Sequence, residues 1–275
     1  MNQARFLLCA LVPACAGFLT AHSELLAQNP KPAFHWPDGK RVAVSLSFDD
    51  ARLSQMDVGL PLFDRYGAKV TFVVNPPNMQ KRLEAWKTAV AHGHEIGNHT
   101  TTHPCSGNFA WSRDNALENY TPAMIEQQMD GANAEILRLV GVKAVTFAYP
   151  CGQKFIGRGV AAQSYVPLVA RRFLVGRGFR DEAANDPLFC DLSQVYGVES
   201  DGMSFDQMKA AVVAASQQGS WLVFAGHEIG VSGSQTTLVS SLEQFLKYAQ
   251  DPANGVWLGT VEKVATYIRA QRGDK

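Results

Sequence analysis

Two pairs of polar residues stand out because together they could bind a metal ion and activate water. Asp49 and Asp50 are adjacent, and His99 and His103 lie four residues apart further along the chain. Two imidazole nitrogens and one carboxylate oxygen form a ligand set for a divalent metal, and a second carboxylate beside that metal can act as a base. A metal with open positions next to a base is the minimum equipment for activating water. These residue types therefore point to a hydrolase.

Both pairs lie where a predicted strand runs out into a loop. Asp49 and Asp50 end the apolar run 42–48, whose β-branched and alternating residues predict a buried strand. The histidines follow segment 93–98, which predicts a short strand and a turn. Because α/β folds place their chemistry at the carboxyl ends of parallel strands, we expect the two pairs to meet at one edge of a sheet.

The composition limits the classes of protein to which this chain can belong. The chain has 275 residues, 46% of them hydrophobic, which is enough to bury a full core in one α/β domain. Its 25 basic and 25 acidic residues give a formal net charge of zero, with no basic block. Binding to nucleic acid or to an anionic membrane through bulk charge is therefore not expected.

Residues 1–27 have the layout of a secretory signal peptide. Arg5 precedes an apolar stretch over 6–20 that is too short and too interrupted to span a membrane. Cleavage after Ser23 or after Ala27 would satisfy the small-residue rule. No second apolar segment of spanning length follows, so we expect a mature protein without a transmembrane segment, either secreted or periplasmic.

A polar, proline-bearing lead is expected over 28–40 and one domain over 41–275, in which strands and helices alternate. The strands are predicted over 42–48, 69–75, 93–98, 144–148, 173–175, 221–225 and 256–258. The helices are predicted over 54–66, 81–92, 122–140, 164–171, 205–217, 236–249 and 261–271. This alternation is typical of parallel β/α units, hence of a barrel or a doubly wound sheet.

Three cysteines remain once the leader is excluded: Cys105, Cys151 and Cys190. In an exported protein, three thiols suggest one disulfide and one leftover cysteine. Cys105 and Cys151 would be the pair if their two loops line one pocket. Three buried free thiols are the alternative.

Four segments, taken in order, resemble the motifs of the polysaccharide deacetylase family, the NodB-homology carbohydrate esterases. They are Ser-Phe-Asp-Asp at 47–50, His-Thr-Thr-Thr-His at 99–103, Phe-Ala-Tyr-Pro-Cys-Gly at 147–152 and Trp-Leu-Val-Phe-Ala-Gly-His at 221–227. The match spans roughly residues 41 to 260. The resemblance implies an α/β fold, a distorted (β/α) barrel in one domain. It also implies a secreted metal-dependent enzyme that removes acetyl groups, N-acetyl above all, from a polysaccharide or cell-wall glycan.

The resemblance also implies a role for each motif residue. Asp50, His99 and His103 would hold the divalent metal, with zinc expected and cobalt or nickel tolerated by the same donors. Asp49 would be the general base that takes the proton of the attacking water. His227 would protonate the leaving amine, because an amine leaves poorly unless it is protonated.

The third motif implies a pocket wall in which the backbone N–H of Cys151 binds the oxyanion and Tyr149 lies against the substrate. The family commonly has an arginine, paired with the base, where this chain has Ala148. Arg177 and Arg158 could replace it, and we expect Arg177, which closely follows the predicted strand 173–175.

A second departure concerns the acid histidine. The family often has an aspartate near a tryptophan that tunes this residue, and no such tryptophan occurs between Arg158 and Asp206. Asp181 and Asp201 are the candidate substitutes, and the sequence leaves the choice between them open.

Two other functions stay open beside a deacetylase whose partner is an acetylated polysaccharide. One is a metal-dependent hydrolase of a small non-sugar amide, and the other is an inactive relative that only binds carbohydrate. The intact pair Asp49 and His227 argues against the second, because a binder needs neither residue. The sequence leaves open whether the glycan is chitin-like, peptidoglycan, another aminosugar exopolysaccharide or acetylated xylan.

Overall fold

The computed structural model describes residues 34–274, which form one compact unit. The expected signal peptide, 1–27, lies outside the described residues. Within 34–274, no helix combines the length and apolar character that crossing a membrane requires. Packing begins inside the segment expected to be a polar lead, because Trp36 is buried and its ring N–H donates to the carbonyl of Gly219 at 2.9 Å.

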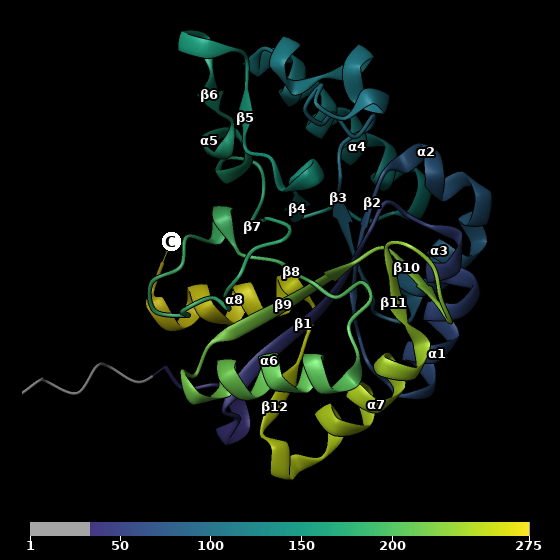
Figure 1. Ribbon diagram of the computed structural model, residues 1–275, viewed down its shortest axis with the longest axis vertical. Helices are drawn as coiled ribbons and strands as arrows, with labels where there is room; N and C mark the ends of the chain where they lie inside the picture. Colours follow the sequence, from purple (N-terminus) through teal and green to yellow (C-terminus); the bar gives the residue numbers. More distant parts are fainter. Residues whose placement is uncertain (1–33, 275) are drawn as a thin grey trace, which may run out of the picture. The chain divides into compact units, whose positions relative to one another are not determined.

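The core is an eight-stranded sheet whose strand pairs are all parallel. Figure 1 shows these strands between the helices. Its strands are β1 (Val42–Asp49), β2 (Thr71–Val74), β3 (Glu95–Asn98), β4 (Thr146–Ala148), β7 (Val175–Arg177), β8 (Val198–Glu199), β9 (Trp221–Gly226) and β12 (Val256–Leu258). Their order is β7-β4-β3-β2-β1-β9-β8, and β12 pairs with the first part of β1. The sheet curls into a half-barrel. A single bridge between Arg177 and Val195 links β7 to the segment that leads into β8. The expected fold, a distorted (β/α) barrel in one domain, is confirmed.

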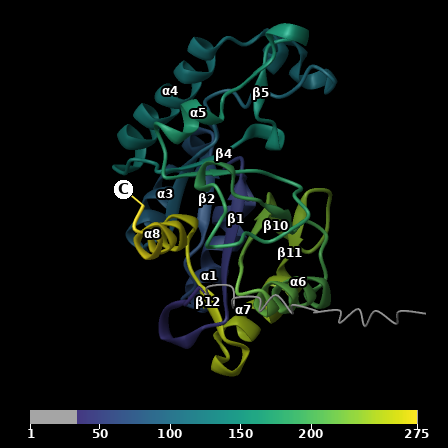
Figure 2. The ribbon, with the colours of Figure 1, turned by 90° about the vertical axis from the view of Figure 1, so that its left-hand side faces the viewer.

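Eight α-helices within 34–274 surround this sheet. They are α1 (Leu60–Arg65), α2 (Pro76–Met79), α3 (Leu83–Ala91), α4 (Pro122–Val140), α5 (Val166–Ala170), α6 (Phe205–Gln217), α7 (Val239–Gln250) and α8 (Val261–Arg272). Figure 2 shows α8 on one side of β1 and α6 on the other. The predicted bounds of α4 are correct because its ends are set locally. Thr121 caps its start by accepting from the Met124 N–H, and Gly141, with φ of 76°, ends it.

Several predicted bounds are wrong where tertiary pairing decides them. The helix predicted over 54–66 is a π-helical turn over Gln55–Gly59 followed by α1. The helix predicted over 236–249 begins only at Val239, because β11 (Thr236–Leu238) pairs with β10 (Glu228–Gly230). A small antiparallel pair, β5 (Phe155–Ile156) and β6 (Gln163–Ser164), was not predicted either.

Side chains that alternate between the two faces of β1 explain how its last residue, Asp49, reaches the interior. Val44, Leu46 and Phe48 belong to the hydrophobic cluster that includes side chains of α6 and α7. Successive side chains of a strand point to opposite faces, so the small polar residues between them, and finally Asp49, lie on the other face. The strand therefore delivers a carboxylate to its own carboxyl end inside the curled sheet.

Candidate active site

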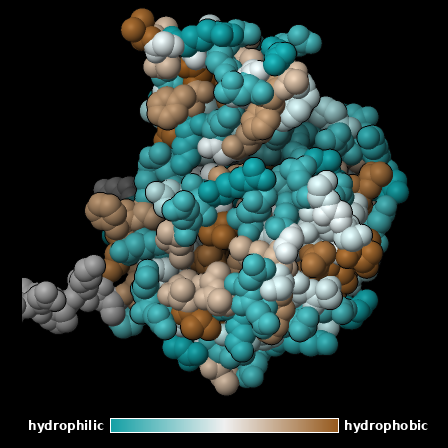
Figure 3. Space-filling model, viewed as in Figure 1, coloured by the Kyte–Doolittle hydropathy of each residue, from teal (hydrophilic) through white to brown (hydrophobic). Residues whose placement is uncertain are grey.

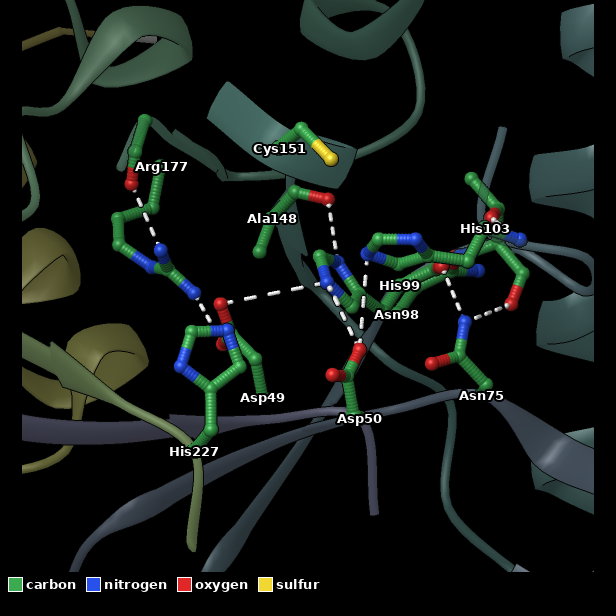
Figure 4. A network of polar contacts seen from close by, with 12 residues as sticks. Asp49, Asp50, Asn75, Asn98, His99, His103, Ala148, Cys151, Arg177 and His227 are labelled. Carbon is green, nitrogen blue, oxygen red and sulfur yellow. Dashed lines mark hydrogen bonds and ion pairs between the residues drawn. The ribbon is translucent and has the colours of Figure 1, made fainter. Parts of the chain in front are cut away.

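Side chains from four distant segments meet at the carboxyl ends of neighbouring strands, as Figure 4 shows. Asp49 ends β1 and Arg177 ends β7, while His99 directly follows β3 and His227 directly follows β9. A cavity of about 950 Å³ is lined by the predicted residues Asp49, Asp50, His99, His103, Cys151 and His227. The parallel register makes this possible, because β1 pairs with β2 and β9, and β2 pairs in turn with β3.

Asp50, His99 and His103 present three donor atoms to one point. The Nε2 atoms of His99 and His103 lie 3.6 and 3.5 Å from Oδ1 of Asp50. Nδ1 of His99 is 2.9 Å from the carbonyl oxygen of Ala148, which can only accept, so this nitrogen carries the hydrogen and Nε2 keeps its lone pair. Burial and the neighbouring His99 lower the pKa of His103 to about 4, which keeps its imidazole neutral. These donors fit a divalent metal ion.

Asp50 offers only one of its two oxygens to that point. Its Oδ2 accepts from the guanidinium of Arg52, with Nη2 at 2.9 Å and Nε at 3.2 Å. Burial raises the pKa of Asp50, but its interactions with His99, His103 and Arg52 outweigh that effect, so the pKa is lowered. The carboxylate is therefore charged and held in one orientation.

Asp49 is buried against Arg177, the arginine expected to approach it. The Arg177 guanidinium hydrogen-bonds to Oδ1 of Asp49 and donates to the carbonyl of Gly178 at 2.7 Å. Burial alone would raise the pKa of Asp49, but Arg177 and His99 outweigh it, so the pKa is lowered. Arg158 is directed elsewhere, to the side-chain oxygen of Asn119 at 2.9 Å.

His227 pairs with Asp201, one of the two aspartates left open by the sequence. Nδ1 of His227 is 2.6 Å from Oδ2 of Asp201, and the His227 N–H donates to Oδ1 at 3.1 Å. Burial lowers the pKa of His227, but the hydrogen bond to Asp201 and the nearby carboxylates outweigh it, so the pKa is raised. Asp181 instead accepts from the Gly197 N–H at 2.9 Å.

The third motif requires one correction. Tyr149 does not face the cavity, because its hydroxyl donates to the Ser193 carbonyl at 2.7 Å and its N–H donates to the Arg177 carbonyl at 3.0 Å. Cys151 does line the cavity, and its N–H makes no hydrogen bond within the described part of the chain. Its φ of 54° turns that N–H out of the regular backbone pattern. The expectation that Tyr149 lies against the substrate is therefore wrong for this cavity, and of the two residues only Cys151 lines it.

The disulfide left open by the sequence is present between Cys105 and Cys151, with Cα atoms 6.0 Å apart. It joins the loop after His103 to the turn that carries the Cys151 N–H. Cys190 is the free cysteine among the described residues. Two loops that border the same cavity are thus covalently linked.

Two amide side chains near the site escaped the sequence reasoning. The buried Gln55 donates from Nε2 to the carbonyls of Asp49, at 2.5 Å, and His227, at 3.0 Å. Asn75 donates in the same way to the carbonyls of His99, at 2.6 Å, and Thr100, at 3.0 Å. Each amide donates to backbone carbonyls outside its own segment. No local signal in the sequence could therefore have identified either residue.

A sequence model of the family described as polysaccharide deacetylase matches residues 37–162. This range contains Asp49, Asp50, His99, His103 and Cys151 and ends before β7. A gellan lyase of a Bacillus species is 27% identical over 257 residues, covering 84% of this chain and 10% of that protein. The chain also spans only 38% of the length of a second curated relative. This chain therefore spans 10% and 38% of the lengths of these two curated relatives.

Solved structures share the fold. An acetyl xylan esterase of family 4 from Clostridium thermocellum, in complex with a cobalt ion, aligns with a TM-score of 0.53 and 19% identity, covering 82% of this chain and 91% of its own. An allantoinase aligns with a TM-score of 0.63 and 16% identity, covering 90% of this chain and 96% of its own. At such identities, the two similarities show a common fold and say nothing about the substrate of this chain.

Proposed function

We propose that this chain, a member of the polysaccharide deacetylase family, is a metal-dependent hydrolase that removes acetyl groups, N-acetyl above all, from a polysaccharide or cell-wall glycan. One observation carries the proposal: a carboxylate bound to Arg177 and an imidazole bound to Asp201 line one cavity together with a set of metal donors, and these pairings lower the pKa of the first and raise that of the second. A base and an acid with separated pKa values are what amide hydrolysis needs.

Asp50, His99 and His103 would hold the metal, for which we propose zinc, with cobalt or nickel as ions that suit the same donors. A bound divalent ion polarises a carbonyl and makes water more acidic. The hydrogen bond from His99 to the Ala148 carbonyl fixes the tautomer that such binding requires. Arg52, on the other oxygen of Asp50, keeps the remaining oxygen directed at the histidines.

Asp49 would take the proton of the attacking water through Oδ2, because Arg177 occupies Oδ1. The free N–H of Cys151 would donate to the oxygen that becomes negative as the acetyl carbonyl is attacked. His227 would then give the proton on Nε2 to the leaving nitrogen, since its Nδ1 is bound to Asp201. This acid is needed for an amide and much less for an ester with a good leaving group, which supports the N-acetyl preference that we propose.

We further propose that the protein is exported. The segment 1–27 has the composition of a signal peptide. A disulfide that links two active-site loops suits an oxidising compartment. Amino-terminal sequencing of the protein recovered from the periplasm or the medium tests this, with a new terminus after Ser23 or Ala27 as the expected result.

Acetate release decides the function. The zinc-loaded protein is incubated with chitooligosaccharides, peptidoglycan, acetylated xylan and allantoin as a small amide. Acetate is expected from at least one glycan. Asp49→Asn should keep its metal and lose about 10²–10⁴-fold in turnover. Hydrolysis of allantoin alone would favour the small-amide alternative, and glycan binding without turnover would favour the inactive relative.

A further inference from the structure

Two exposed aromatic side chains stand at the rim of the active-site cavity. Phe109 and Trp111 both line it and are 42% and 64% exposed. Their ring centroids lie 5.5 Å apart at an interplanar angle of 24°, and the Trp111 ring is 6.0 Å from the ring of His103. Tryptophan is highly buried on average, so an exposed stacked pair beside a reactive group indicates a surface that a ligand covers.

The wider surface makes this pair stand apart. On the face that Figure 3 shows, hydrophobic residues occur in separate small groups among hydrophilic ones. Other exposed aromatic residues, such as Phe189 and Phe155, do not line the active-site cavity. Phe109 and Trp111 are therefore distinguished by their place beside the proposed metal donors.

The loop that carries the pair is held in place by contacts at both of its sides. Cys105, at its start, is bonded to Cys151. Ser112, next to Trp111, is buried, and its hydroxyl donates to the Cys105 carbonyl at 2.9 Å and accepts from the Cys105 N–H at 3.0 Å. Asn115 donates to the Thr102 carbonyl at 3.0 Å. A surface fixed before binding loses little entropy when a ligand arrives, so it can discriminate between ligands.

The shape and chemistry of the cavity suit a sugar ring. Its volume of about 950 Å³ lies near the top of the range of roughly 300–1,000 Å³ for ligand sites, far more than an acetyl group fills. The face of an aromatic ring is negative, and the C–H face of a pyranose ring is apolar and slightly positive. Lys81, Arg180 and Gln235 also line the cavity and can bind the hydroxyl groups at the edge of the sugar.

We infer that the Phe109–Trp111 pair is a stacking platform for a sugar ring of the substrate glycan, and that Trp111 determines the preference for glycans over small acetylated compounds. The inference rests on the proposed function, because a deacetylase of small compounds would leave this platform without an occupant. Trp111 contributes the larger exposed ring and lies beside His103, so it carries most of the effect.

The test compares a glycan with a small ester in the same variants. Initial rates on penta-N-acetylchitopentaose, acetylated xylan and 4-nitrophenyl acetate are measured with the zinc-loaded protein. In Trp111→Ala the ratio of kcat/KM for the glycan to kcat/KM for the ester should fall about tenfold, mainly through KM. Trp111→Phe, which keeps a ring, should recover most of the ratio. Phe189→Ala, an exposed aromatic outside the cavity, is the matched control and should keep the parent ratio.

Equal losses on glycan and ester in Trp111→Ala, or an unchanged ratio, would overturn the platform and assign Trp111 to the support of His103. If the parent releases no acetate from either glycan, the proposed function is wrong for these two glycans. Glycan binding by the platform is then tested separately, by electrophoresis through gels that contain glycol chitin or xylan. A retarded parent and an unretarded Trp111→Ala would support the platform. An unretarded parent would overturn it as well.

Discussion

At the residue scale, the ionisation of Asp49 depends on a buried arginine. Burial opposes the charge on Asp49, and Arg177 is the strongest of the groups that hold its pKa low. The proposed base works only when it is ionised, so the rate should fall as the pH drops through this pKa. Arg177→Ala should raise the pKa by ~1–3 units and move the acidic limb of the kcat/KM profile to higher pH.

Arg158→Ala is the matched control for that change, because Arg158 contacts Asn119 and not Asp49. Circular dichroism of both variants shows whether the fold persists, and Arg177→Lys, which keeps the charge, should retain more of the parent profile. An unmoved acidic limb in a folded Arg177→Ala protein would show that Asp49 does not depend on Arg177.

The basic limb of the kcat/KM profile should depend on Asp201. Burial lowers the pKa of His227, and its hydrogen bond to Asp201 is the largest of the effects that raise it above the ordinary value. The proposed acid must be protonated to act, so the rate should fall as the pH rises through this pKa. Asp201→Asn should shift the basic limb to lower pH and reduce amide hydrolysis more than ester hydrolysis. Asp181→Asn, at an aspartate that contacts Gly197, should leave the limb in place.

The proposed metal donors can be tested one at a time. His99→Ala, His103→Ala and Asp50→Ala should each lose the bound ion and nearly all activity, because each removes one of three donors. The fold should persist, since the hydrophobic clusters do not include these residues. Metal content is measured by mass spectrometry on the purified variants. Full occupancy in any one of them would remove that residue from the site.

At the element scale, the Cys105–Cys151 disulfide links the loop after β3 to the turn after β4. The bridged residues are 46 positions apart, so chain entropy assigns the bond a stabilisation of about 4 kcal/mol. Removing it also frees the turn that positions the Cys151 N–H. The double variant Cys105→Ser, Cys151→Ser should unfold at a lower temperature. Its turnover rate should fall by a larger factor than its content of bound metal.

Cys190→Ser is the control, because Cys190 takes no part in the bond. A thiol reductant should lower the melting temperature of the parent and of Cys190→Ser alike and leave the double variant unchanged. A parent indifferent to reductant would contradict the structural role of the bond.

At the scale of the whole molecule, Glu95 joins the sheet to the C-terminal helix. Its Oε2 accepts from the Thr71 hydroxyl at 2.7 Å and from the Glu262 N–H at the start of α8 at 2.9 Å. Burial raises its pKa above the ordinary value of 4.5 despite these hydrogen bonds. The folded state thus keeps its proton longer than the unfolded state, so this group makes the protein less stable as the pH rises above 4.5.

Glu95→Gln removes that titration and should reduce the loss of stability between pH 5 and pH 8. Urea unfolding at both pH values gives the two free energies of unfolding for the parent and the variant. Glu262→Gln removes a neighbouring charge that also raises the pKa of Glu95, so it should reduce the loss of stability less than Glu95→Gln does. The same pH dependence in Glu95→Gln and in the parent would show that Glu95 does not titrate between these values.

The sequence by itself determined what depends on neighbouring residues. The alternation of 42–48 predicted β1 with Asp49 at its end, and the caps around 122–140 predicted α4, because both signals lie within a few residues. It also predicted the fold class and the residues Asp50, His99 and His103 that meet in the cavity, since parallel strands bring their carboxyl ends to one edge.

Only the tertiary structure decided which partners these residues have. Arg177 is 128 positions from Asp49, and Asp201 reaches His227 because β8 pairs with β9. The direction of Tyr149, away from the cavity, likewise depends on a carbonyl in another segment, at Ser193. Such contacts are set by strand order and packing between segments far apart in the chain. A local pattern of residues therefore cannot predict them. These contacts nevertheless bury and pair Asp49 and His227, and so determine the direction in which the pKa of each is shifted.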